Sequence, residues 1–144
     1  MEPLIEQMKV VLASTFSLYL KAHGYHWNVT GPNFSEYHSF FGGFYEGLHD
    51  SVDPIAEHIR ALGAFAPASL MRFTELTTVQ DESSIPQASI MFARLAADNN
   101  TVLLEYRKAH DLASATGQHG LINFIEGQMD WHEKMAWQLK AFIQ

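Results

Sequence analysis

The chain has 144 residues, of which 47% are hydrophobic, and a formal net charge of −7, so we expect one compact domain over residues 1–144. No cluster of Lys or Arg provides a surface for nucleic-acid phosphates, and the absence of cysteine excludes disulfides and thiolate metal sites. The N-terminal residues lack signal-peptide features, and no uncharged apolar run approaches the ~18 residues of a membrane span, which predicts a cytoplasmic protein without membrane contact.

A first helix is predicted from Glu2 and Pro3, because an acid and a proline are both favoured in a first helical turn. A stripe follows in steps of three and four: Ile5, Met8, Leu12, Thr15, Tyr19, Ala22 and His26. His26 ends this buried stripe, so its ring should face protein. A hydrogen-bonded core histidine would by itself explain such a position.

The second predicted helix follows the turn at residues 30–33, is capped by Ser35 and Glu36, and ends at Gly63. Its interior contains Pro54, which should kink the helix or mark an irregularity. Three helical glycines favour close approach of another backbone or a bulky aromatic: Gly42, Gly43 and Gly47. Beside the apolar stripe runs a second one: His38, Gly42, Tyr45, His49, Asp53 and Glu57.

Residues 65–80 show no clean periodicity and predict a long connection, with a short helix at Ala68 to Phe73, that can join two parallel neighbours. A third helix is predicted over residues 88–113 and a last one over residues 122–143, separated by a break from Gly117 to Gly120. The expected fold class is therefore all-α, a four-helix bundle with a long second connection.

Histidines and carboxylates on apolar helical faces indicate a metal site, because a metal offsets the cost of burying them. Asp53 and Glu57 are one turn apart and can bind one cation together, although such acid pairs are also common on solvated faces. His38 precedes Asp53 by 15 residues, which is about 22 Å along a helix. These groups either serve different purposes or meet across a twofold axis between two subunits.

Several motifs together resemble one family. They are HWNVTGPNF at residues 26–34, His38 twelve residues after His26, the pair Asp53 and Glu57, IRALG at residues 59–63, and HEKMAWQL at residues 132–139. The pattern is similar to the mini-ferritins called Dps, the DNA-binding proteins from starved cells. The resemblance implies a ferritin-like bundle assembled from twofold dimers into a hollow dodecamer. It also implies a ferroxidase that oxidises Fe(II) with hydrogen peroxide or dioxygen, stores ferric mineral and protects against oxidative damage.

Carried over residue by residue, the resemblance implies a catalytic metal centre between subunits. His26 and His38 would come from one subunit, and Asp53 and Glu57 from its partner. Trp27 matches the tryptophan that packs beside the centre. The family pattern has an aspartate four residues after His38, where this chain has Gly42, so one iron position should be weakened.

Two nearby residues are candidates to compensate for the missing carboxylate. His49 lies one turn before Asp53, and Glu46 lies two turns after His38; surface roles explain both equally well. Glu46 and His49 also form a single Glu-x-x-His motif, and without a second one we expect no di-iron site inside the bundle. His132 is predicted to be a core or interface histidine. Four histidines have no predicted role: His23, His58, His110 and His119.

Two other functions compete with the ferroxidase. Gly42 favours a non-enzymatic cage that sequesters metal, with zinc as a substitute for iron. The second competing function is that of a DNA-compacting protein of the nucleoid. Members of this family that bind DNA strongly tend to use basic tails. The N-terminal segment offers only Lys9, and the chain ends in Phe142, Ile143 and Gln144. We expect weak or absent DNA binding at physiological salt.

Overall fold

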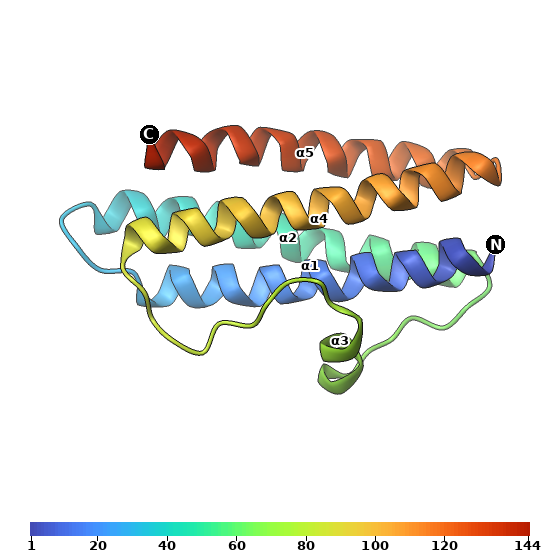
Figure 1. The fold of residues 1–144 in the computed structure, drawn as a ribbon, viewed down its shortest axis with the longest axis horizontal. Helices are drawn as coiled ribbons and strands as arrows, with labels where there is room; N and C mark the ends of the chain where they lie inside the picture. The colour runs from blue at the N-terminus through green and yellow to red at the C-terminus, as the bar shows by residue number, and fades with distance from the viewer.

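The computed structural model describes all 144 residues as five helices without a strand (Figure 1). They are α1 (Glu2–Asn28), α2 (Phe34–Ala61), α3 (Leu70–Leu76), α4 (Ala88–Ala115) and α5 (His119–Ile143). The four long helices form a bundle, and the short α3 lies in the connection between α2 and α4. The predicted all-α fold with a short helix in its long connection is confirmed. None of the helices is both long enough and apolar enough to cross a bilayer.

The long connection sets the directions of the helices. Figure 1 shows α1 and α2 running antiparallel, and α4 and α5 likewise. Residues 62–87 return along the whole bundle, so α4 starts at the same end as α2 and runs parallel to it. α1 packs against α2, α4 and α3, while α4 pairs closely with α5.

Two helix starts differ from the predictions. α2 begins at Phe34, so Ser35 and Glu36 lie inside its first turn; the carbonyl of Asn33 already accepts the first helical bond from Tyr37 (3.1 Å). The short helix spans Leu70–Leu76 instead of residues 68–73, because the Ser69 hydroxyl caps it by accepting from the Arg72 N–H (3.1 Å). α2 continues through Pro54, and Gly63, with φ of 96°, follows its end.

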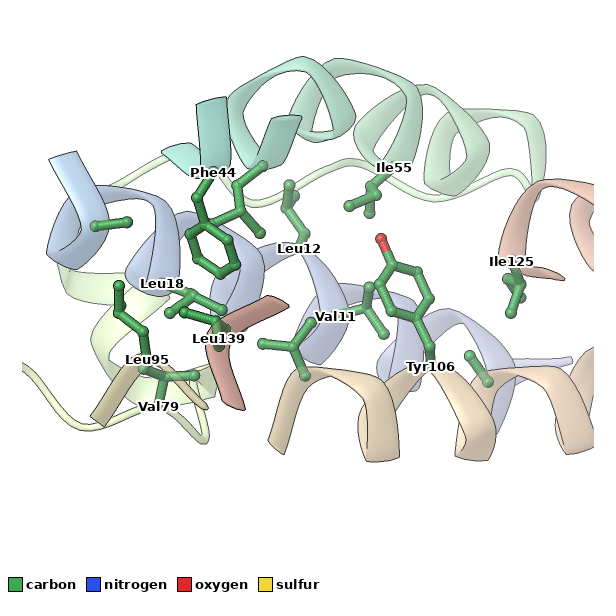
Figure 2. Packing of buried hydrophobic residues seen from close by; sticks show 14 of the residues in the cluster. Val11, Leu12, Leu18, Phe44, Ile55, Val79, Leu95, Tyr106, Ile125 and Leu139 are labelled. Carbon is green, nitrogen blue, oxygen red and sulfur yellow. The ribbon is translucent and has the colours of Figure 1, made fainter. Parts of the chain in front are cut away.

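The core is one cluster of 24 buried side chains contributed by all four long helices and, outside them, by Val29 and Val79. Figure 2 shows Leu12 of α1, Phe44 of α2 and Tyr106 among the side chains of this cluster. At roughly 1.5 to 3 kcal/mol for each large apolar side chain removed from water, this cluster is the main source of stability.

A helical glycine lets α5 approach α2. The Trp131 ring of α5 lies directly over Gly47, where a Cβ would overlap the ring, with its Cε2 only 2.9 Å away. The predicted approach of a bulky aromatic is thus found at Gly47. Gly43 has no atom within 4 Å of its Cβ position, so no such contact explains that glycine.

Polar contacts fix the second half of the connection to the bundle. Glu82 accepts a hydrogen bond from the Tyr25 hydroxyl of α1 (2.6 Å) and forms an ion pair with Arg94 of α4. The Tyr25 hydrogen bond is the main reason why the pKa of Glu82 is lowered to about 2. Lys21 of α1 donates to the Gln80 carbonyl (3.0 Å) and pairs with Asp98 of α4 (2.7 Å). The connection is therefore tied to the groove between α1 and α4.

Candidate metal centre

His26 and His38 meet at the corner between α1 and α2. His26 lies in the last turn of α1 and His38 in the second turn of α2, and both are half-buried. Each ring donates from Nδ1 to the backbone carbonyl of the other residue, at 2.7 Å in both cases. Because Nδ1 carries the proton, the Nε2 lone pair of each neutral ring is left for another partner. This is the form of imidazole that binds a metal ion.

The two rings are stacked, with centroids 3.7 Å apart and planes inclined by 17°. An imidazole lone pair lies in the plane of its ring, so two stacked rings do not direct their Nε2 atoms at one point. In this arrangement the two histidines present two adjacent binding positions. Convergence on a single ion would require one ring to rotate and to lose its Nδ1 hydrogen bond.

Gly42 lies beneath the His26 ring. A Cβ at this position would be 3.2 Å from Cε1 and 3.3 Å from Nδ1 of His26, which is tighter than usual van der Waals contact. The imidazole therefore occupies the space beside the backbone where a side chain would start. No carboxylate is supplied from this turn of α2, where the family pattern has an aspartate.

Asp53 and Glu57 form the second half-site, far along α2. Both carboxylates are exposed, and no hydrogen bond or ion pair within the chain involves either of them. Fifteen residues of helix place His38 about 22 Å from Asp53. Within the chain no three His, Asp or Glu side chains are grouped to hold a metal ion. The structure thus joins His26 to His38 and leaves the acid pair apart from them.

The candidate auxiliary residues also lie on this face. His49 is exposed and packs on the Tyr19 ring, with centroids 4.9 Å apart. Glu46 is exposed and has no hydrogen-bond partner in the chain, and it makes no contact with the histidine pair. Trp27 is 60% exposed; its ring centroid lies 4.1 Å from that of His23, and its ring does not pack on the His26 or His38 ring.

A row of aromatic rings on α1 and α2 was not foreseen. His23 stacks on Tyr45 with centroids 3.8 Å apart and planes inclined by 9°, and its Nδ1 is 3.0 Å from the Tyr19 hydroxyl. Burial, assisted by the charges of His26 and His49, lowers the pKa of His23. The spacing of Tyr19 and His23, one turn apart, was the only signal in the sequence. The stacking on Tyr45 joins two helices and has no such signal.

The interior of the bundle holds a different polar group. His132 of α5 is fully buried; its Nδ1 donates to Asn99 Oδ1 (2.7 Å), and Asn99 Nδ2 donates to the His132 carbonyl (2.8 Å). Burial lowers the pKa of His132 to about 3. The only buried acid, Glu105, is bound by Gln7 (2.8 Å) and Lys108 (2.9 Å). His132 is therefore a core histidine, as predicted, while the half-buried His110 pairs with Glu126 (2.9 Å).

Comparison with known proteins shows which family the chain resembles. The model of the ferritin-like domain family matches residues 5–144. A low temperature-induced protein of Nostoc sp. is 34% identical over 92% of this chain and 75% of its own. The DNA protection during starvation protein 2 of Bacillus anthracis is 29% identical over 96% of this chain and 95% of its own.

A solved structure agrees with these relatives. The Dps protein of Vibrio cholerae, described as a member of a broad superfamily of ferritin-like diiron-carboxylate proteins, superposes with a TM-score of 0.95. It is 25% identical over 99% of this chain and 90% of its own. The family match covers nearly every residue, and the Vibrio cholerae structure superposes over almost the whole chain. The chain belongs to the Dps family of ferritin-like proteins.

Proposed function

We propose that the chain is a mini-ferritin that binds and oxidises Fe(II) at centres shared by two subunits. One observation carries the proposal: the chain bears two incomplete sets of free ligands, imidazole Nε2 atoms where α1 meets the start of α2 and exposed carboxylates far along α2. Two copies related by a twofold axis would bring His26 and His38 of one chain opposite the acid pair of the other. Each dimer would then hold two complete centres.

The donor atoms suit Fe(II) as substrate. Neutral imidazole binds ferrous iron well, and the hard anionic oxygens of Asp53 and Glu57 favour the ferric product. The hydrogen bonds at Nδ1 fix both imidazoles before iron arrives, so little ordering is required on binding. Hydrogen peroxide or dioxygen would take the electrons. A superfamily of diiron-carboxylate proteins that includes the Vibrio cholerae relative supports iron as the metal.

The larger assembly in the proposal is a hollow homododecamer that collects ferric mineral inside. The net charge of −7 favours the entry and retention of cations in such a cavity. Because Gly42 supplies no carboxylate, one of the two iron positions within each centre should bind iron more weakly than the other.

A mixed-subunit experiment tests the shared centre. One variant carries His26→Ala and His38→Ala, and the other carries Asp53→Ala and Glu57→Ala; each alone should lose rapid Fe(II) oxidation in stopped-flow absorbance. Co-expressed with different affinity tags and purified through both, the two variants should recover part of the wild-type rate. In each mixed dimer the intact histidines of one chain face the intact acids of the other, while the second centre lacks every ligand.

Native mass spectrometry of the mixed particle provides the control for assembly. Recovery of oxidation in particles that contain both variants supports a centre between subunits. Inactive mixed particles of full size would exclude it, because one complete centre per mixed dimer is then present without activity. Rapid oxidation by either variant alone would show that the ligands lie elsewhere.

A further inference from the structure

His49 is a histidine of α2 whose imidazole has no polar partner in the chain. The side chain is exposed, and no hydrogen bond within the chain involves either of its ring nitrogens. The Tyr19 ring of α1 packs against it, with centroids 4.9 Å apart and planes inclined by 52°. This contact holds the ring on the surface formed by α1 and α2 and leaves the imidazole lone pair free to bind a ligand.

The position of His49 around α2 places it on the face that bears other candidate ligands. It follows His38 by 11 residues, which is about three helical turns, and it precedes Asp53 by one turn. Side chains separated by whole turns lie above one another, so these three share one face of the helix. His58 is on the opposite side of α2, where its ring packs on Phe124 of α5 (4.7 Å). This face is therefore not shared by every histidine of α2.

Two overlapping pairs of ligands follow one another along this part of α2. His49, Asp53 and Glu57 are spaced by one turn, so His49 with Asp53 can bind one ion and Asp53 with Glu57 another. His26 and His38 likewise present two adjacent binding positions, because their stacked rings do not direct their Nε2 atoms at one point. Each half-site therefore offers donors for two neighbouring ions.

The proposed twofold dimer determines which levels of two antiparallel α2 helices face each other. His38 of one chain lies opposite the middle of the acid pair of the other chain, at the level of residue 55. Four residues further along, the level of Gly42 lies opposite that of residue 51. Residue 51 is midway between His49 and Asp53. Gly42 and this pair of ligands therefore meet across the interface.

The imidazole found at the level of Gly42 is that of His26. A Cβ on Gly42 would be only 3.2 Å from Cε1 of His26, so the ring lies directly beside the backbone at this level. His26 of one chain therefore faces the pair His49 and Asp53 of the other, while His38 faces the acid pair. The two imidazole positions of one chain match the two overlapping pairs of its partner.

We propose that His49 is an iron ligand, which binds together with Asp53 the ion that is held by His26 of the other chain. This inference rests on the proposed function. Each centre then has three imidazoles and two carboxylates, and Asp53 lies between the two ions. Imidazole suits Fe(II), whereas carboxylate oxygens favour the ferric product. The His49 position should therefore prefer Fe(II) more strongly than the position between Asp53 and Glu57.

Anaerobic titration with Co(II) tests this ligand without any oxidation of iron. The visible absorption of Co(II) is sensitive to nitrogen ligands, and calorimetry in parallel counts the ions bound per chain. The variant is His49→Phe, which keeps a ring against Tyr19 and removes both nitrogens. His58→Phe is the matched control, because it makes the same change on the opposite side of the same helix. Native mass spectrometry verifies that each variant forms particles of wild-type size.

Wild type and His58→Phe should each bind two Co(II) per chain. His49→Phe should bind one as tightly as wild type, with the affinity for the second at least tenfold lower and the visible absorption reduced. Identical titrations of wild type and His49→Phe would overturn the inference. The variant with His26→Ala and His38→Ala tests the proposed function separately. If that variant keeps the wild-type titration, the shared centre is absent and the role of His49 fails with it.

Mixed particles show on which side of the interface His49 acts. In co-expressed particles, the complete centre takes its histidines from the chain without the acid pair, and its acids from the chain without the histidine pair. His49→Phe in the chain that supplies the acids should weaken Co(II) binding by these particles. The same substitution in the chain that supplies the histidines should leave binding at the value of the parent particles. The opposite pattern, or no difference between the two placements, would contradict a ligand that acts across the interface.

Discussion

Gly42 is the position at which a single added side chain should change metal binding. Gly42→Asp would place a carboxylate one turn after His38, on the same face of α2. Calorimetric titration with Fe(II) without oxygen should then show more iron bound per chain than in wild type. The gain requires the His26 ring to move by a few tenths of an ångström, since a Cβ would lie 3.2 Å from its Cε1.

Gly42→Ala separates the carboxylate from the steric effect. Alanine brings the same Cβ and gains about 1 kcal/mol of helix propensity, but it adds no ligand. Iron stoichiometry should stay at the wild-type value in this variant. If Gly42→Asp particles of normal size bind no additional iron, the missing carboxylate is not what limits the number of iron ions bound per chain.

At the scale of elements, α4 and α5 are joined through the buried pair Asn99 and His132. The fold holds His132 neutral, with a pKa of about 3, whereas an unfolded chain protonates it near 6.5. Between these two pKa values the unfolded state therefore binds one proton more than the folded state. The full contribution of buried His132 to the free energy of unfolding is present only above pH 6.5. As the pH falls below 6.5, this site should reduce the free energy of unfolding by about 1.4 kcal/mol per pH unit.

Urea unfolding at several pH values and one protein concentration measures this slope. His132→Gln should be less stable at neutral pH and show a flatter decline toward acid. His110→Gln, which removes a half-buried histidine of α4, should keep the wild-type slope. Identical slopes in wild type and His132→Gln would mean that His132 is not the group responsible.

Helix periodicity and helix-breaking residues account for the parts of the fold that could be predicted. Apolar residues in steps of three and four identify the four long helices, and Gly63 and Gly117, both with positive φ, mark breaks. The start of α3 could not be placed exactly, because the Ser69 cap is one local hydrogen bond among several polar candidates. Pro54 lies inside α2, which continues past it, and the expected kink at this residue stays a prediction.

The only features of the candidate site that could be predicted are those set by the spacing of residues along one helix. The distance of 15 residues between His38 and Asp53 separates two half-sites without knowledge of any partner chain. Contacts between helices have no such signature. The crossed hydrogen bonds of His26 and His38, the His26 ring over Gly42, and the stack of His23 on Tyr45 all depend on how α1 packs against α2.

The net charge of the whole molecule predicts whether the assembled particle binds nucleic acid. A chain with charge −7 repels phosphates, and repeated copies in an assembly multiply that charge. Gel-shift assays at physiological salt should therefore show no complex with duplex DNA. A retarded band that weakens as salt increases would contradict this prediction and reveal a basic surface formed on assembly.

The crossed hydrogen bonds between His26 and His38 make the two ligands thermodynamically coupled. Each imidazole is held by the other residue's carbonyl, so truncating one ring removes one bond and leaves the other ring without its stacking partner. The losses of metal affinity from two single substitutions should therefore not sum to that of the double variant. The corner between α1 and α2 therefore presents its two imidazoles as one coupled unit, in which a change to either ring alters the affinity of both positions for metal.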